Sequence, residues 1–223
     1  MKKQILNIFM VFALGITMIA CKDKAKEANT NEAEAVAEST SNSVKYSANA
    51  EASVIEWKGF KPTGTHNGTV NIESGVLKTE NGSLQSGTFL IDMASIVSLD
   101  LEGDYKDSLE NHLKGTVEGK EGDFFNVTKF PTGAFEITGT ETNEAGQTIL
   151  SGNLTLKETK YNVSFPIAIT NEDNTLTLSS DAFTIDRTKW GVNYKSKTIF
   201  DGLGDKFIND EIELKITIKA TKA

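Results

Sequence analysis

The chain has 223 residues, of which 38% are hydrophobic, and its 31 acidic residues outnumber 23 lysines and arginines for a formal charge of −8. This acidic balance argues against binding to nucleic acid or to anionic lipid headgroups through a basic surface. A single cysteine excludes an intramolecular disulfide. The length beyond residue 44 is sufficient for one domain with a sizeable core.

The first twenty residues are typical of a signal peptide. Two lysines precede an uncharged, mostly apolar run from Ile5 to Ala20, which is short for a transmembrane helix but suits the core of a secretory signal. The run ends in "MIAC", which resembles the lipobox of bacterial lipoproteins, although Met18 stands where leucine is commoner. The resemblance implies cleavage after residue 20 and acylation of Cys21. The alternative is an ordinary secretory signal followed by an incidental cysteine.

Residues 21–44 are expected to form a disordered acidic tether. They consist mainly of Ala, Glu, Lys, Asn, Ser and Thr, and offer little apolar surface to bury. Ordering such a segment costs conformational entropy that so little burial does not offset. We therefore expect the tether to be dispensable for folding, and the folded domain to span residues 45–223.

Within this domain the hydrophobic pattern has a period of two. The clearest strands place alternate residues on one face: Tyr161, Val163, Phe165, Ile167 and Ile169 in one, and Ile212, Leu214, Ile216 and Ile218 in another. Short turn sequences such as Asn81-Gly82 separate the strands, which predicts antiparallel hairpins. An all-β chain of this size closes as a barrel or splits into a sandwich. Sequential hairpins favour a closed antiparallel barrel of about eight strands.

Alternation does not by itself say which face of a strand lies inside. A membrane β-barrel would turn the apolar face to lipid. Aromatic girdles are not evident, and the chain end "KATKA" lacks the terminal aromatic residue expected of such a barrel. A barrel with its apolar face inward is therefore favoured.

One segment breaks the strand pattern. In "DYKDSLENHLKG", Tyr105, Leu109, His112 and Leu113 recur at helical spacing, and Gly115 suits a C-cap, which predicts a short helix. It is followed by "DFFNVTKFPTGAF", residues 123–135, in which two phenylalanines are adjacent. Neighbours in a strand point to opposite faces, so a regular strand would turn one of them to water.

Sequence motifs for catalysis are lacking. The only histidines are His66 and His112, and no zinc-protease, P-loop or serine-hydrolase motif is present. We interpret "DRTKW", residues 186–190, as structural, with a salt bridge and a cation–π contact between Arg187 and Trp190. We therefore expect neither an enzyme nor a metal or cofactor site.

The order and spacing of several short pieces resemble the YceI-like domain family. The pieces run from about Tyr46 to Ala220 and comprise "EWKGF", "GTHNG", "DFFNV", "FPTGAF", "LSGNLTL" and "FTIDRTKWGV". The family consists of secreted bacterial proteins with a lipocalin-like barrel that binds polyisoprenoid lipids. This chain departs from the pattern in "KGTVEGKEG", which lengthens a loop near the expected barrel mouth.

The resemblance implies that residues 123–131 form an irregular rim rather than a strand, so that both Phe124 and Phe125 turn inward before Pro131 starts the next strand. The lipobox-like "MIAC" implies an envelope lipoprotein, anchored in the outer membrane on the periplasmic side or cell surface. The family resemblance implies that this lipoprotein carries, stores or senses a polyisoprenoid or isoprenoid-quinone-like lipid. The residues expected to contact this lipid are Trp57, Phe89, Ile91, Phe124, Phe125, Phe130, Phe135, Tyr161, Val163, Phe165, Ile167, Trp190, Leu214 and Ile216. The alternative is a barrel filled by side chains that serves as a structural or interaction module.

Overall fold

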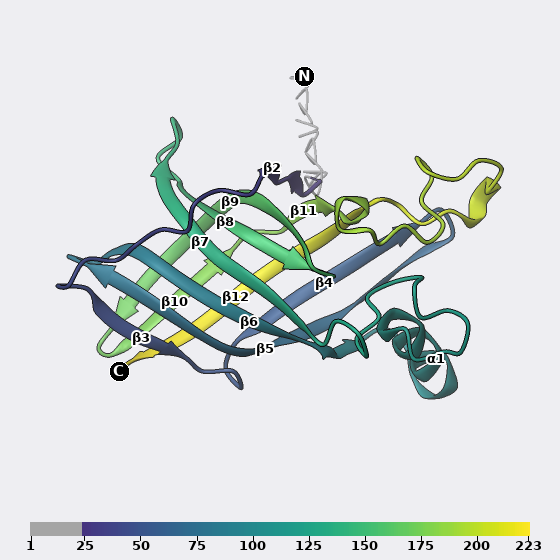
Figure 1. Ribbon diagram of the computed structural model, residues 1–223, viewed down its shortest axis with the longest axis horizontal. Helices are drawn as coiled ribbons and strands as arrows, with labels where there is room; N and C mark the ends of the chain where they lie inside the picture. Colours follow the sequence, from purple (N-terminus) through teal and green to yellow (C-terminus); the bar gives the residue numbers. More distant parts are fainter. Residues whose placement is uncertain (1–23) are drawn as a thin grey trace, which may run out of the picture.

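The computed structural model describes residues 24–223, so the expected signal peptide and Cys21 lie outside the described residues. Most of the described chain belongs to one β-sheet, and one α-helix lies at its edge (Figure 1). The elements are β1 (Lys26–Glu27), β2 (Asn29–Glu32), β3 (Val44–Ala48), β4 (Val54–Lys61), β5 (Gly64–Glu80), β6 (Ser83–Ser98), α1 (Gly103–Lys114), β7 (Thr132–Thr142), β8 (Thr148–Leu156), β9 (Thr159–Glu172), β10 (Thr175–Ser180), β11 (Phe183–Asp186), the 3₁₀ turns η1 (Arg187–Trp190) and η2 (Gly204–Lys206), and β12 (Glu211–Lys222).

Eight strands form a closed antiparallel ring. Its order is β4, β5, β6, β7, β8, β9, β10 and β12, and β12 pairs back onto β4. Strand β3 lies in the same gap as β4, between β5 and β12 and nearer to the other end. The predicted all-β class and closed antiparallel barrel are therefore confirmed.

The two ends of the barrel differ. One end is made of tight hairpins, and at Asn81-Gly82 both residues have positive φ, as the predicted two-residue turn requires. Buried side chains that include Tyr46, Leu77 and Leu176 fill the barrel near this end. The opposite end carries α1, residues 115–131, which we call the rim segment, and the loop between η1 and β12 (Figure 1, right). We call it the mouth end.

Helix α1 forms where the helical spacing predicted it. It ends at Gly115, whose φ of 69° lies in the left-handed region and whose N–H bonds to the last carbonyls of the helix. A Cβ at this position would come within 2.6 Å of the carbonyl oxygen of Glu121. Glycine is therefore required both by the backbone conformation and by the close approach of the rim segment.

The N-terminal segment of the described chain is ordered, in contrast to the expected tether. We call residues 24–43 the N-terminal strap. Its strand β1 pairs in parallel with β11, and β2 pairs antiparallel with residues 161–164 of β9. Ala28, between the two strands, is buried in the core. The expectation of disorder over residues 21–44 is thus wrong for this part of the segment.

Beyond β2 the strap crosses the outside of the barrel. The Glu34 N–H donates to Asn153 Oδ1 at 3.0 Å, and Asn153 Nδ2 donates to the Glu34 carbonyl at 2.7 Å. Farther along, the Ala37 N–H donates to the carbonyl of Ile137, which lies at a β-bulge between β7 and β8. The strap is held by hydrogen bonds from its backbone to unpaired backbone groups of the barrel and to the side-chain amide of Asn153, which needs little apolar surface. The low apolar content of residues 21–44 therefore did not reveal that the strap is ordered.

Candidate functional site

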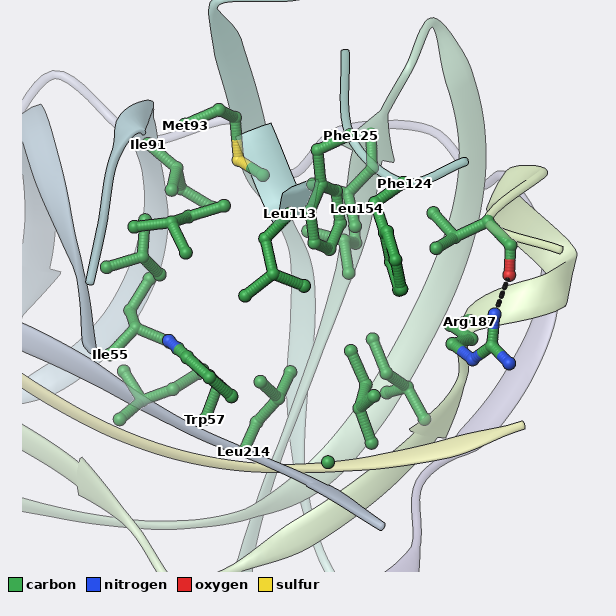
Figure 2. A pocket seen from close by; sticks show the side chains of 18 of the residues that line it. Ile55, Trp57, Ile91, Met93, Leu113, Phe124, Phe125, Leu154, Arg187 and Leu214 are labelled. Atoms are coloured by element: carbon green, nitrogen blue, oxygen red, sulfur yellow. Dashed lines mark hydrogen bonds between the residues drawn. The ribbon is translucent and has the colours of Figure 1, made fainter. Parts of the chain in front are cut away.

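The barrel encloses a cavity of about 370 Å³ that opens toward the mouth end. This volume lies within the range of small-molecule sites in proteins. Its wall is apolar almost throughout, and Figure 2 shows side chains from opposite sides of the barrel converging on the space. The barrel strands contribute Ile55, Trp57, Val70, Phe89, Ile91, Met93, Phe135, Leu150, Leu154, Val163, Phe165, Leu178, Leu214, Ile216 and Ile218, among others.

Strand β12 runs from the hollow part of the barrel into its filled part. Its residues Ile212, Leu214 and Ile216 point inward but are only partly buried. Their remaining exposed surface belongs to the cavity they line. Farther along the same face, Ile218 still lines the cavity but is only 2% exposed, and Ala220 is 1% exposed and lies beyond the cavity, in the filled part of the barrel. The same alternating pattern thus lines a cavity at one end and a packed core at the other.

Most of the predicted contact residues lie in the cavity wall. These are Trp57, Phe89, Ile91, Phe124, Phe125, Phe135, Val163, Phe165, Leu214 and Ile216. Four others do not line the cavity: Phe130, Tyr161, Ile167 and Trp190. These four therefore lie outside the cavity wall, and their contact with the lipid stays a prediction.

Packing explains why the aromatic pair Tyr161 and Trp190 lies outside the cavity. Trp190 is fully buried in η1, and its indole N–H donates to the Leu154 carbonyl at 3.0 Å. The ring of Tyr161 contacts that of Trp190 edge-on, with centroids 5.6 Å apart. Both rings are thus occupied in seating η1 against β8 and β9. Ile167 is buried on β9, and Phe130 lies on the rim under the ammonium of Lys129.

The rim segment orients both adjacent phenylalanines inward, as the resemblance implied. Residues 115–131 contain no strand, and Asn126 directly after the pair has a positive φ of 48°. Backbone bonds from Phe125 N–H to the Leu113 carbonyl and from Val127 N–H to the Lys114 carbonyl tie the segment to the end of α1. Freed from strand geometry, Phe124 and Phe125 both line the cavity (Figure 2).

Polar groups gather only at the mouth. His112 Nε2 lies 2.7 Å from Asp123 Oδ2, and the His112 ring packs edge-on against Phe124 and Tyr194 with centroids 5.0 and 4.9 Å apart. These contacts join α1, the rim segment and the loop before β12. Both histidines of the chain line the cavity, but His66 belongs to a separate pair with Asp100.

The environment of Asp100 favours its charged form. Burial alone would raise its pKa, but hydrogen bonds from neighbouring groups outweigh burial and hold the pKa below its ordinary value. The neighbours are the Asn67 N–H at 2.9 Å, His66 Nδ1 at 2.8 Å and the Ser98 hydroxyl at 3.0 Å. This carboxylate thus fixes the mouth ends of β5 and β6.

Arg187 organises the loop from residue 192 to residue 210. Its side chain is 3% exposed and binds four backbone carbonyls, which belong to Val192, Tyr194, Ile208 and Asn209. Burial lowers the pKa of Arg187, while Asp210 and Asp186 counteract this effect. With Asp210 Oδ1 3.8 Å from its guanidinium, the cation is compensated by one carboxylate and four carbonyl dipoles.

The predicted cation–π contact between Arg187 and Trp190 is wrong. Among residues 24–223, the cation–π contacts involve lysines only, and the guanidinium points to the loop carbonyls instead (Figure 2). The predicted salt bridge exists, but its partner is Asp210 across the loop. The prediction rested on the three-residue spacing between Arg187 and Trp190. The sequence did not show that the guanidinium would instead donate hydrogen bonds to the loop carbonyls.

Sequence reasoning missed two groups of wall residues. Strand positions such as Ile55, Val70 and Leu178 have the alternation that could have found them. Loop residues such as Tyr194 and Ile208 follow no periodic pattern, because Arg187 determines their place.

Within residues 24–223, no helix has the length and apolar character needed to cross a membrane. The same residues hold no cluster of three or more His, Cys, Asp or Glu side chains arranged to bind a metal ion.

A family model of the YceI-like domain matches residues 46–220. No curated protein matches the chain. Similar solved structures include Burkholderia cenocepacia BcnA, with 18% identity and a TM-score of 0.60, covering 78% of this chain and 99% of that one. A polyisoprenoid binding domain from Saccharophagus degradans has 10% identity and a TM-score of 0.56, covering 81% and 99%. At such identities these likenesses establish the fold.

The family match runs from within β3 to Ala220 in β12 and so covers the eight strands of the ring, and the neighbours share its architecture. The motifs quoted from the sequence form the cavity wall and the mouth of this barrel. The chain therefore belongs to the YceI-like domain family.

Proposed function

We propose that this protein binds a long apolar lipid, of the polyisoprenoid or isoprenoid-quinone class, inside its barrel. The observation that carries the proposal is the 370 Å³ cavity, whose wall is apolar and whose polar groups are confined to the mouth. A neighbouring fold, the domain from Saccharophagus degradans, is described as polyisoprenoid-binding, which supports the same ligand class.

The chemistry of the wall favours a chain over a polar ligand. Each buried CH₂ group contributes about 0.8 kcal/mol, so a hydrocarbon chain gains affinity along its length without polar contacts. A sugar, nucleotide or peptide would leave hydrogen-bonding groups unpaired in this cavity, at a cost of about 1–3 kcal/mol each. A lipid whose polar head stays at the mouth matches both parts of the site.

The proposal includes binding without catalysis, and a carrier, storage or sensing role in the bacterial envelope. It further includes anchoring through acyl groups on Cys21, which rests on the "MIAC" sequence. Intact-mass analysis of protein extracted from membranes should show a chain that begins at Cys21 and carries added acyl mass. A mature chain that begins elsewhere and is released in soluble form would remove the anchor from the proposal.

Native mass spectrometry of the purified protein tests the lipid. We expect a co-purified apolar lipid in the wild type and a marked loss of it in Leu214→Trp, which fills the cavity from a half-buried wall position. Leu90→Trp is the matched control, because Leu90 is 36% exposed and does not line the cavity. If neither the wild type nor the control carries lipid, the barrel is a scaffold and the alternative of a structural module holds.

A further inference from the structure

The mouth end exposes apolar side chains that do not belong to the cavity. We call residues 193–209, between η1 and β12, the mouth loop. Within this loop, the adjacent residues Ile199 and Phe200 are 48% and 47% exposed. At the same end, Leu99 directly after β6 is 63% exposed, and Tyr105 in the first turn of α1 is 81% exposed. The two other large apolar side chains that are exposed in residues 24–223 are Val36 and Leu90.

The mouth loop is held rigidly. Arg187 fixes its two ends through backbone carbonyls, and the Thr198 hydroxyl donates to Asp210 Oδ2 at 2.7 Å. The Phe200 N–H donates to the carbonyl of Ser196, which is itself fully buried. The exposed pair therefore cannot reach the core without breaking these bonds. Adjacent apolar side chains that stay exposed in this way are typical of surfaces that contact a membrane or another protein.

The charge around this pair differs from that of the whole protein. The mouth loop holds three lysines and two aspartates, a net charge of +1, in a chain of formal charge −8. Lys195 lies 5.1 Å from the ring centroid of Tyr194, and Lys197 lies 5.8 Å from that of Phe207. Lysines beside aromatic and aliphatic side chains are the composition found at membrane interfaces, where the ammonium reaches the headgroups.

The start of the described chain points to the same end. Lys24 Nζ lies 3.1 Å from Glu211 Oε2, and Glu211 is the first residue of β12, next to the mouth loop. Cys21 precedes Lys24 by three residues, which span at most about 10 Å when extended. Acyl groups on Cys21, which are part of the proposed function, would therefore be held near the mouth end.

We propose that the mouth loop docks onto a phospholipid bilayer, with Ile199 and Phe200 inserted among the headgroups and the cavity opening directed at the membrane. In this orientation an apolar chain passes between bilayer and cavity without exposure to water. Lys195 belongs to both surfaces, since it lines the cavity and lies on the docking loop. The inference rests on the proposed lipid binding but concerns a separate surface.

The test uses tryptophan fluorescence with vesicles of brominated phosphatidylcholine and phosphatidylglycerol. Brominated acyl chains quench a tryptophan that enters the bilayer. The variant Phe200→Trp places the reporter on the mouth loop, and Leu90→Trp places it on the outer barrel wall, at a residue of similar exposure. The native Trp57 and Trp190 contribute equally to both. We expect emission about twofold lower on brominated than on plain vesicles for Phe200→Trp, and equal emission for Leu90→Trp.

Equal quenching of the two variants would overturn the docking. Native mass spectrometry of the same samples separates the two proposals: lipid retained without selective quenching rejects the mouth loop alone, whereas selective quenching without lipid rejects the lipid-binding function alone. A second variant, Phe200→Asp, should slow lipid uptake from vesicles about tenfold at an unchanged melting temperature. Unchanged uptake would contradict the docking, because entry would then not need the loop in the bilayer.

Discussion

At the scale of single residues, the mouth depends on one buried cation. Arg187 satisfies four carbonyls of the loop between residues 192 and 210, and Asp210 compensates its charge. Lysine keeps the charge but offers a point donor in place of a planar fork, so it cannot reach the same carbonyls. The buried carbonyls would remain without donors, each at a cost of about 1–3 kcal/mol.

We therefore expect Arg187→Lys to lower the free energy of unfolding by about 3 kcal/mol, as measured by urea denaturation. Lys189→Ala, two residues away on the half-buried side of η1, should change it by less than about 0.5 kcal/mol. Similar values for the two variants would show that the loop does not need the guanidinium.

The two adjacent phenylalanines should respond differently to truncation. Phe124 is 7% exposed and packs between the rings of His112 and Tyr194, so Phe124→Ala should cost about 3–5 kcal/mol in unfolding free energy. Phe125 is only partly buried against the cavity. Phe125→Ala should cost less than Phe124→Ala but release bound lipid, as read by native mass spectrometry. A larger stability loss in Phe125→Ala, with lipid retained, would identify it as an ordinary packing residue.

At the scale of elements, the N-terminal strap is part of the barrel wall. Strand β9 pairs with β10 only from Ile167 to Glu172, and β2 takes the free edge at residues 161–164. Removing residues 24–43 would return this edge to water and uncover Asn153 and Asn162, which are each 1% exposed. The strap therefore protects backbone and amide groups on which the adjoining strands depend.

We expect deletion of residues 24–43 to cost about 2 kcal/mol, which corresponds to a fall of about 4–8 °C in melting temperature for a domain of this size. Thermal unfolding followed by circular dichroism measures it. Val36→Ala, an exposed position in the strap, serves as the control and should leave the melting temperature unchanged. Identical melting of the deletion variant would restore the original expectation of a dispensable tether.

At the scale of the whole molecule, the filled end of the barrel provides stability and the hollow mouth end provides the cavity. The filled end supplies packed apolar contacts, whereas the wall of the hollow end lacks partners across the cavity until a ligand enters. Stability should therefore depend on lipid, because a ligand that binds only the folded state shifts the folding equilibrium.

Delipidated protein should melt at a lower temperature than protein that retains its lipid. A polyprenol added at a hundredfold excess over its dissociation constant should restore about 2.7 kcal/mol. Leu214→Trp, with its cavity filled, should show little response to the same addition. A wild-type melting temperature that is independent of lipid would mean that the cavity is not a binding site.

The sequence by itself determined the features that depend on local periodicity and turn chemistry. Alternation in β9 and β12 requires half-buried strands, Asn81-Gly82 favours a tight hairpin, and the spacing from Tyr105 to Leu113 favours a helix. The inward turn of both Phe124 and Phe125 was expected from the resemblance to the YceI-like family, and the absence of a strand in residues 115–131 allows it.

Only the tertiary structure decided which inward-facing positions line a cavity and which fill a core. Leu214 and Ala220 follow the same alternation on β12, and the volume left between distant strands makes Leu214 a wall residue and Ala220 a packed one. The partners of Arg187 and the docking of the strap likewise depend on backbone groups far along the chain. Periodicity records which side of a strand is apolar, whereas free volume and unpaired backbone edges arise only when separate strands come together.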